Sequence, residues 1–261
     1  MNAILSALSA NLRLVDLSVT LGNGSSELVP INIDYMDHDF GGRHLSQLSG
    51  IKQHELPNGL GWASEHVFAN THAGTHIDAP FHYAPTCGDS ASRTIDELPL
   101  DWFWGPGVCI TVDQAPENKS ITPDEVCAFE KRHDIRIGKG WIALFCTGAG
   151  QFYGSKEYSD HGRGFAPETV CLLLDRGVRL FGTDAWSIDP PFRITSEKVA
   201  EHGPGVVWEA HYVGRDREFC AIEKLQNLQY LPPHGFWVAS FPIKVRRGSA
   251  AWTRAVALVA S

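Results

Sequence analysis

The chain alternates between short apolar runs and longer polar stretches, a pattern typical of a mixed α/β protein. Three runs, 107–112, 141–146 and 178–182, are largely apolar at both alternating positions, with Arg179 as the exception. Strands buried on both faces of a sheet show this pattern, whereas half-exposed strands alternate apolar and polar residues. We therefore expect these three runs to be the central strands of one sheet.

Helices are expected between these runs. Thr122 and Glu125 have the spacing of a capping box, and Pro123 occupies the first helical position, where its missing N–H is not needed. This pattern predicts a helix that continues to about Lys131. A second helix is predicted to begin at Pro167, ahead of the third apolar run.

The two ends of the chain add further elements. Residues 2–12 have the pattern of a short amphipathic helix, and residues 14–21 have that of a strand. Two more strands are predicted at 235–241 and 255–259, on either side of a polar turn at 246–249. They predict a hairpin-like closing segment.

The stretch 22–61 is rich in Gly, Ser, Asp, His and Pro, and we expect long loops there that help to shape a functional site. No repeat, low-complexity tract or linker-like change of composition is visible along the sequence. With 261 residues, of which 43% are hydrophobic, the chain can bury a full core. We therefore expect one α/β domain that spans residues 1–261.

Charge and cysteine content narrow the class of protein. The formal net charge of -8 and a pI near 5.8 leave no basic stripe for nucleic acid or an anionic membrane. The six cysteines are dispersed with no CxxC pair, and no window approaches the ~18 apolar residues of a spanning helix. We expect a cytoplasmic protein that acts on a small molecule, with no nucleic-acid or membrane partner.

One segment carries most of the candidate chemistry. His72, His76, Asp78 and His82 fall within eleven residues, all at even positions. An extended backbone would place them on one face, but a straight strand at ~3.3 Å per residue would spread them too far for one ion. The chain must therefore bend, and Gly74, which lacks a Cβ, is where we expect the bend.

Two imidazoles and a carboxylate form a ligand set that suits Zn(II), Mn(II) or Fe(II) and leaves open positions for water and substrate. His76 and Asp78, two residues apart, form the firmest pair. The alternative is that these histidines only cap turns or satisfy buried polar groups. The clustering of four such residues favours a catalytic metal site.

The pattern His-x-Gly-Thr-His-x-Asp-x-Pro-x-His from His72 to His82 resembles the cyclase family of metal-dependent hydrolases. That family includes kynurenine formamidase, isatin hydrolase and trans-dienelactone hydrolase. Further similarity extends along most of the chain, at 16–18, 182–189 and 222–228. The resemblance implies a single α/β domain of swivelling β/β/α type with a barrel-like mixed sheet, assembled as a dimer or tetramer.

The resemblance also implies roles for individual residues. One metal would be held by His72, His76 and Asp78, with one or two Zn(II) or Mn(II) ions per chain. By the same resemblance, a second metal would be held by Asp78, His211 and Glu223. His82 would be the proton carrier. Glu209 lies close to His211 in the sequence and is a rival ligand.

The expected function is hydrolysis of a cyclic amide or lactone, by attack of metal-bound hydroxide on the carbonyl. The alternatives are an arylformamidase acting on N-formyl-kynurenine, a metal-dependent cyclase or dehydratase, and a metal-dependent binding protein without turnover. A serine hydrolase is disfavoured because no Gly-x-Ser-x-Gly elbow occurs. Asp184 and Asp189 lie between Gly182 and Pro190 and could either support the site from behind its ligands or form a turn. The turn chemistry of Gly182 and Pro190 favours the structural role for both.

Overall fold

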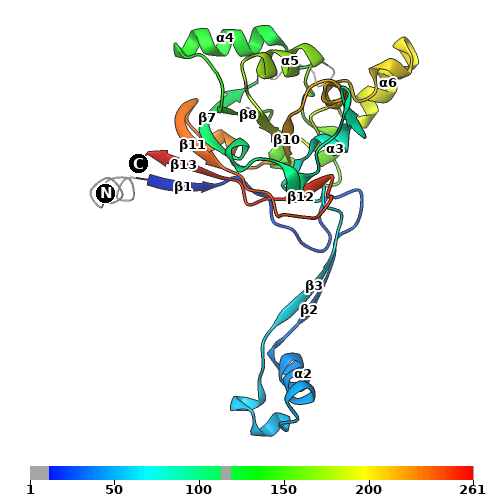
Figure 1. Ribbon diagram of the computed structural model, residues 1–261, viewed down its shortest axis with the longest axis vertical. Helices are drawn as coiled ribbons and strands as arrows, with labels where there is room; N and C mark the ends of the chain where they lie inside the picture. The colour runs from blue at the N-terminus through cyan, green and yellow to red at the C-terminus, as the bar shows by residue number, and fades with distance from the viewer. Residues whose placement is uncertain (1–11, 113–118, 261) are drawn as a thin grey trace. The chain divides into compact units, whose positions relative to one another are not determined.

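The computed structural model describes residues 12–112 and 119–260 (Figure 1). The described chain forms two compact units: unit 1 contains the residues up to Thr20 and from Thr71 onward, and unit 2 contains Leu21–Asn70. The mixed α/β class is confirmed, while one domain over 1–261 stays a prediction. Of the helix predicted at 2–12, only Leu12 is described, and it begins a strand.

Unit 1 is built on a nine-stranded sheet in the order β1-β13-β11-β7-β8-β9-β10-β4-β12. The strands from β7 to β10 are mutually parallel, and their neighbours on both sides are antiparallel. The three predicted central strands are therefore confirmed as β7, β8 and β9. The strand bounds are β1 (Leu12–Asp16), β4 (His76–Asp78), β7 (Trp104–Thr111), β8 (Ile142–Cys146), β9 (Leu180–Thr183), β10 (Cys220–Glu223), β11 (His234–Ala239), β12 (Ala250–Trp252) and β13 (Val256–Ala260). A small ribbon pairs β5 (Thr86–Cys87) with β6 (Ser90–Ala91).

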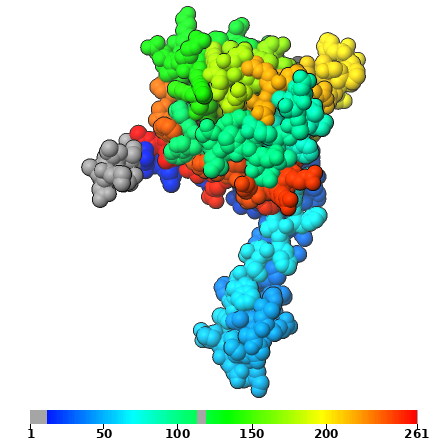
Figure 2. Space-filling model, in the orientation of Figure 1, coloured from blue at the N-terminus to red at the C-terminus, as the bar shows by residue number. Residues whose placement is uncertain are grey.

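The two helices predicted at Pro123 and Pro167 begin where the sequence pattern places them. The Thr122 hydroxyl accepts a hydrogen bond from the backbone N–H of Glu125, which forms the predicted capping box. The α-helices are α3 (Pro80–Tyr83), α4 (Pro123–His133), α5 (Pro167–Asp175), α6 (Phe192–His202) and α7 (Glu209–Tyr212). Short 3₁₀ helices occur at Ile95–Glu97, Leu100–Trp102, Ala149–Phe152, Tyr158–Asp160, Pro204–Val206, Val213–Arg215 and Leu228–Tyr230. Helix α6 projects from the body of unit 1 (Figure 2).

Successive side chains of the central strands face two different cores. In β8, Ala143 and Phe145 are buried under α4 and α5, which lie on one side of the strands (Figure 1). Leu144 and Cys146 face the opposite core, which β1, β11 and β13 help to enclose. Each large apolar side chain that is fully buried contributes about 1.5–3 kcal/mol. This two-sided burial explains why the run shows no polar alternation.

The closing strands differ slightly from their predicted bounds. The predicted strands at 235–241 and 255–259 are β11 and β13, which pair antiparallel as expected. The sequence pattern did not indicate β12, which lies between them in the chain and pairs with β4. No helix formed by residues 12–112 and 119–260 is both long and apolar enough to cross a membrane.

Unit 2 corrects the prediction of long loops over 22–61. Its strands β2 (Asn32–Met36) and β3 (Ser64–Phe68) form an antiparallel ribbon, with helix α2 (His38–Ser49) between them. Short 3₁₀ helices follow at Gln53–Glu55 and Pro57–Gly59. The glycines permit close packing: a Cβ on Gly41 would lie 1.8 Å from the Trp62 carbonyl oxygen. Glycine here serves a helix contact, a role that composition does not distinguish from loop flexibility.

Candidate metal centre

The segment from His72 to His82 changes conformation three times. His72 lies in a turn, and Gly74 adopts a left-handed backbone with φ 59°, which is the predicted bend. His76 and Asp78 are the first and last residues of β4. His82 lies in α3, so the predicted extended backbone holds only for the central pair. Pro80, at the first position of α3, starts that helical turn.

The antiparallel register of β4 and β10 brings a distant carboxylate to this segment. His76 lies directly opposite Glu223, and Asp78 lies opposite Ala221. Residues opposite each other in such a pair point to the same face of the sheet. The His76 Nε2 atom is accordingly 3.5 Å from Glu223 Oε2 and 3.3 Å from Asp78 Oδ1.

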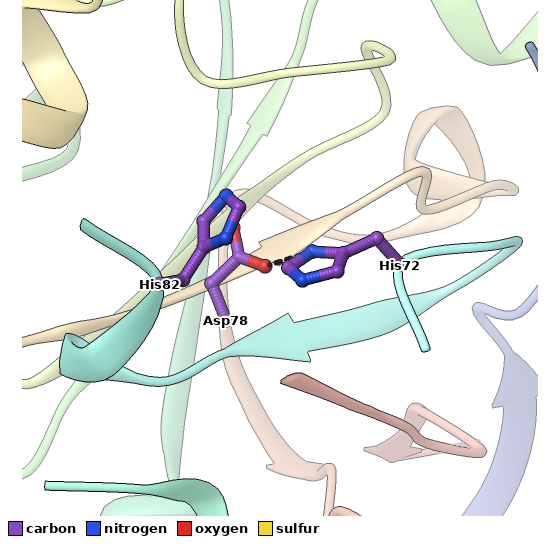
Figure 3. A group of neighbouring side chains, drawn as sticks. All are labelled: His72, Asp78 and His82. Atoms are coloured by element: carbon purple, nitrogen blue, oxygen red, sulfur yellow. Dashed lines mark ion pairs between the residues drawn. The ribbon is translucent and has the colours of Figure 1, made fainter. Parts of the chain in front are cut away.

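His72 and His82 approach Asp78 from either end of the segment (Figure 3). The His72 Nδ1 atom is 2.9 Å from Asp78 Oδ1, and its Nε2 atom is 3.1 Å from the hydroxyl oxygen of Ser249. The rings of His72 and His82 are 4.1 Å apart between centroids. Two trios of side chains have ligand atoms close enough to hold an ion: His72, Asp78 and His82, and His76, Asp78 and Glu223.

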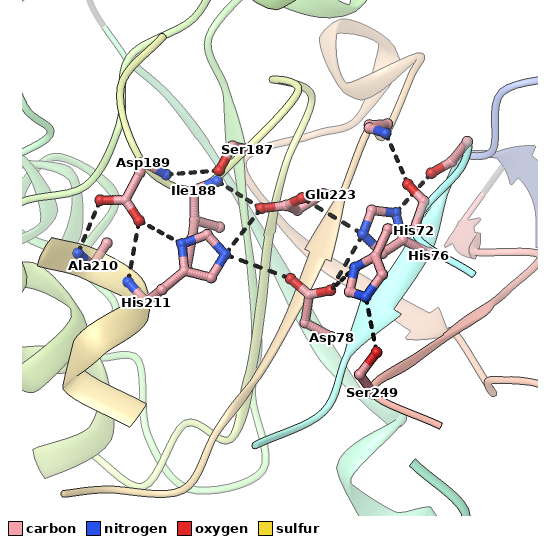
Figure 4. A network of polar contacts seen from close by, with 12 residues as sticks. His72, His76, Asp78, Ser187, Ile188, Asp189, Ala210, His211, Glu223 and Ser249 are labelled. Atoms are coloured by element: carbon pink, nitrogen blue, oxygen red, sulfur yellow. Dashed lines mark hydrogen bonds and ion pairs between the residues drawn. The ribbon is translucent and has the colours of Figure 1, made fainter. Parts of the chain in front are cut away.

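His211 in α7 joins the cluster from the opposite side (Figure 4). Its Nε2 atom is 3.7 Å from Asp78 Oδ2 and 3.6 Å from Glu223 Oε1. Its Nδ1 atom is hydrogen-bonded to Asp189, which also accepts the backbone N–H groups of Ala210 and His211. This contact orients the imidazole so that Nε2 faces the two carboxylates.

The structure brings together all six residues singled out from the sequence: His72, His76, Asp78, His82, His211 and Glu223. Their assignment as ligands or proton carrier stays a prediction. Among the described residues, neither trio of close ligand atoms includes Glu209. Asp184 accepts hydrogen bonds from Thr147 and from the backbone of Gly148, which is the structural role that the sequence favours.

Asp189 takes the less favoured of its two expected roles, because it supports the site through its hydrogen bond to His211. Trp208 and Ser249 were not identified at all, although Trp208 stacks on His211 with ring centroids 4.8 Å apart. No spacing within the sequence marks these contacts. Only the packing of α7 and of the segment before β12 against the site reveals them.

The buried polar atoms of the site fit a cation. Both carboxylate oxygens of Asp78 and the Nε2 atom of His76 are buried without a hydrogen bond of adequate geometry among the described residues. The His76 Nδ1 atom contacts the Gly74 carbonyl oxygen at 2.8 Å, which leaves Nε2 facing the carboxylates. A buried carboxylate in this state is costly unless it is paired or coordinates a metal. The donor set of imidazole and carboxylate suits Zn(II) or Mn(II).

The electrostatics of the cluster reflect crowded charges in a buried place. Burial opposes ionisation of Asp78, but the surrounding histidines hold its pKa well below the usual range. Burial and the neighbouring Asp78 raise the pKa of Glu223. Burial disfavours the charged form of His211, yet hydrogen bonds to Asp189 and Asp78 raise its pKa to about 10. Burial lowers the pKa of His82 to about 4. A metal would replace the protons of its ligands, because ligand side chains bind deprotonated.

Comparison with known proteins identifies a family and several proteins that this chain resembles in sequence and fold. A model of the family described as "Putative cyclase" matches residues 15–190. A kynurenine formamidase of Salinibacter ruber is 32% identical over 188 residues, which cover 72% of this chain and 76% of that protein. An isatin hydrolase of Roseibium aggregatum is 30% identical over 206 residues, covering 72% of each. A crystal structure of an isatin hydrolase bound to the product analogue thioisatinate shares the fold, with a TM-score of 0.78, 22% identity and coverage of 100% of this chain and 97% of that one.

Proposed function

This chain belongs to the cyclase family, and from that premise we propose that it is a metal-dependent hydrolase that opens a cyclic amide or lactone. The observation that carries the proposal is the buried cluster of histidines and carboxylates around Asp78, whose oxygens lack adequate hydrogen bonds. Relatives named as a formamidase and an isatin hydrolase support the hydrolase class. The name of the isatin hydrolase supports a cyclic amide as the substrate.

The proposed metal ligands come from two groups that share Asp78. His72, His76 and Asp78 would hold one Zn(II) or Mn(II) ion, and His211 and Glu223 would complete a second site with Asp78. When bound, such an ion lowers the pKa of a water and polarises a carbonyl oxygen. The protein contributes a buried cradle in which His76 and Asp78 are almost entirely removed from solvent.

His82 is the proposed proton carrier. Its ring lies 4.1 Å from that of His72 and 5.5 Å from that of His211, so it borders both proposed ligand groups. A neutral imidazole in this place can take a proton from an attacking water and deliver it to the leaving nitrogen or oxygen. Atom distances would also allow His82 to act as a ligand with His72 and Asp78, and the metal content of a His82→Ala variant distinguishes the two roles.

Hydrolysis of N-formyl-kynurenine is the second candidate. The 32% identity to a kynurenine formamidase favours it, and the same residues would serve it, because both reactions add water to an activated carbonyl. In the first candidate the scissile amide or ester bond lies within a ring, whereas in the second an amide bond outside any ring is cleaved.

The test measures metal content and turnover in the same protein sample. Elemental analysis is followed by assays on isatin, N-formyl-kynurenine and trans-dienelactone, before and after chelation. We expect a stoichiometric divalent metal and activity that chelation removes and metal addition restores. In ¹⁸O-labelled water a hydrolase incorporates the label into its product, whereas a cyclase or dehydratase does not. A protein that binds no divalent metal under any loading condition would refute the proposal.

A further inference from the structure

Lys224 is a buried cation next to the candidate metal centre. Only 2% of the residue is exposed, although lysine is almost never fully buried unless its charge is compensated. The residue directly follows Glu223, the last residue of β10, and has a left-handed backbone with φ 59°. A non-glycine residue in that region is uncommon and carries a conformational cost that surrounding contacts must offset.

The side chain of Lys224 reaches the turn that carries His72. Its Nζ atom donates a hydrogen bond of 2.8 Å to the backbone carbonyl oxygen of His72. The same ammonium group lies 4.9 Å from the centroid of the Trp186 ring, within the range of a cation–π contact. The ammonium group therefore connects the turn at His72 to the segment that follows β9.

The backbone of Lys224 is tied to the same neighbourhood. Its N–H donates to the Ala185 carbonyl oxygen at 3.0 Å, and its carbonyl oxygen accepts the Thr75 hydroxyl at 2.6 Å. Thr75 in turn accepts the backbone N–H of Val19 at 2.9 Å. These contacts hold Lys224 in place independently of its ammonium group.

His72 needs such a tether more than His76 or Asp78 does. The latter two belong to β4, whose hydrogen bonds to β10 and β12 set their positions. His72 precedes the left-handed Gly74 and lies outside the strand, so no sheet ladder places it. The Lys224 ammonium holds the backbone of this turn through the His72 carbonyl oxygen, while the Ser249 hydroxyl contacts the imidazole.

We propose that Lys224 is a positioning residue that holds His72 against the Asp78 side of the metal centre. The inference rests on the proposed function, because it concerns a ligand of the proposed metal. Lys224 does not touch the reacting atoms. Its ammonium contacts the site through the His72 carbonyl oxygen, and a double-mutant cycle with His72 tests whether its effect on metal binding depends on that residue.

The experiment measures the dissociation constant of Zn(II), by competition with a chromophoric chelator, for Lys224→Met, Lys224→Arg and the wild-type protein. Lys224→Met keeps the apolar stem and removes the donor, and we expect it to weaken Zn(II) binding by about 10–100-fold. Lys224→Arg restores a cationic donor and should recover part of the affinity. Arg176→Met is the control, because it removes a largely buried cation, with 9% of its side chain exposed, that pairs with Glu130 in the α4–α5 region and should not change the Zn(II) affinity.

The cycle repeats these measurements in the His72→Ala background. If Lys224 acts through His72, Lys224→Met causes no further loss of Zn(II) affinity there. A full additional loss in that background, or unchanged affinity in the single variant, overturns the inference. If Lys224→Met does not fold, as judged by circular dichroism, Lys224→Gln takes its place in both backgrounds. Failure of the wild-type protein itself to bind Zn(II) or Mn(II) refutes the proposed function instead.

Discussion

His76 on β4 and Glu223 on β10 lie directly opposite each other in an antiparallel pair, with Nε2 and Oε2 3.5 Å apart. The strand pairing fixes the positions of the two backbones, and the Ile188 N–H donates to Glu223 Oε1, so this pair is anchored by the sheet. His72 and His211 come from a turn and a short helix. Each of these two is held by a further side chain, Lys224 for His72 and Asp189 for His211.

The first prediction separates a metal ligand from a proton carrier. His76→Ala should abolish metal binding, because it removes a buried nitrogen that faces both carboxylates. His82→Ala should retain the metal while turnover falls by about 10²–10⁴-fold, the range for loss of a general acid or base. Elemental analysis and kcat on the same samples check both. A metal-free His82→Ala protein would place His82 among the ligands.

The second prediction concerns the carboxylate behind His211. Asp189→Asn removes the charge that orients the His211 ring, and we expect metal affinity to fall by about 10–100-fold. Asp175→Asn is the control, since this exposed carboxylate pairs with Arg217 on the surface. Zn(II) titration of both variants measures the effect. Equal affinities in the two variants would show that Asp189 serves the fold rather than the metal.

The third prediction uses the ion pair of Arg163 and Glu125, joined by hydrogen bonds of 2.7 and 3.0 Å. Burial acts against ionisation of Glu125, but Arg163 and the Thr122 cap outweigh it and lower its pKa below the usual 4.5 of a glutamate. A carboxyl whose pKa is lower in the folded state stabilises the fold above its unfolded pKa. That contribution is lost as the pH falls through the folded pKa.

Glu125→Gln should therefore reduce the free energy of unfolding by about 1–3 kcal/mol at pH 7. The difference from wild type should shrink as the pH falls below 4.5. Urea denaturation across this pH range measures it, with Glu168→Gln as the exposed control on α5. A difference that stays constant with pH would assign the loss to packing.

The fourth prediction tests the helix contact in unit 2. Gly41→Ala would place a Cβ 1.8 Å from the Trp62 carbonyl oxygen, so the backbone must shift, at a cost of about 1–3 kcal/mol. Gly22→Ala is the control, because no heavy atom lies within 4 Å of its Cβ position. Amide hydrogen exchange of residues 38–49 should accelerate only in Gly41→Ala. Equal exchange rates in the two variants would contradict the close packing.

Local sequence patterns predicted the secondary structure correctly where residues close together in the chain determine it. The runs that form β7, β8 and β9 are apolar at successive positions because both faces of these strands are buried. The capping box at Thr122 starts α4 through contacts between residues three apart in the chain. The same reasoning failed at 22–61, where glycines at a helix contact gave the composition of a loop. Periodicity cannot separate those two uses of glycine.

The sequence by itself determined the candidate chemistry of His72, His76, Asp78 and His82, because these residues lie within eleven positions. Their convergence needs the predicted bend at Gly74 and also the helical turn that carries His82. His211 and Glu223 entered through a family resemblance, and for Asp189 the sequence favoured a turn over the contact with His211 that the structure has. Only the tertiary structure decided that β10 pairs with β4 and that α7 packs beside it. Such contacts join residues far apart in the chain, and strand register is set by the burial of whole faces. No local spacing records that register.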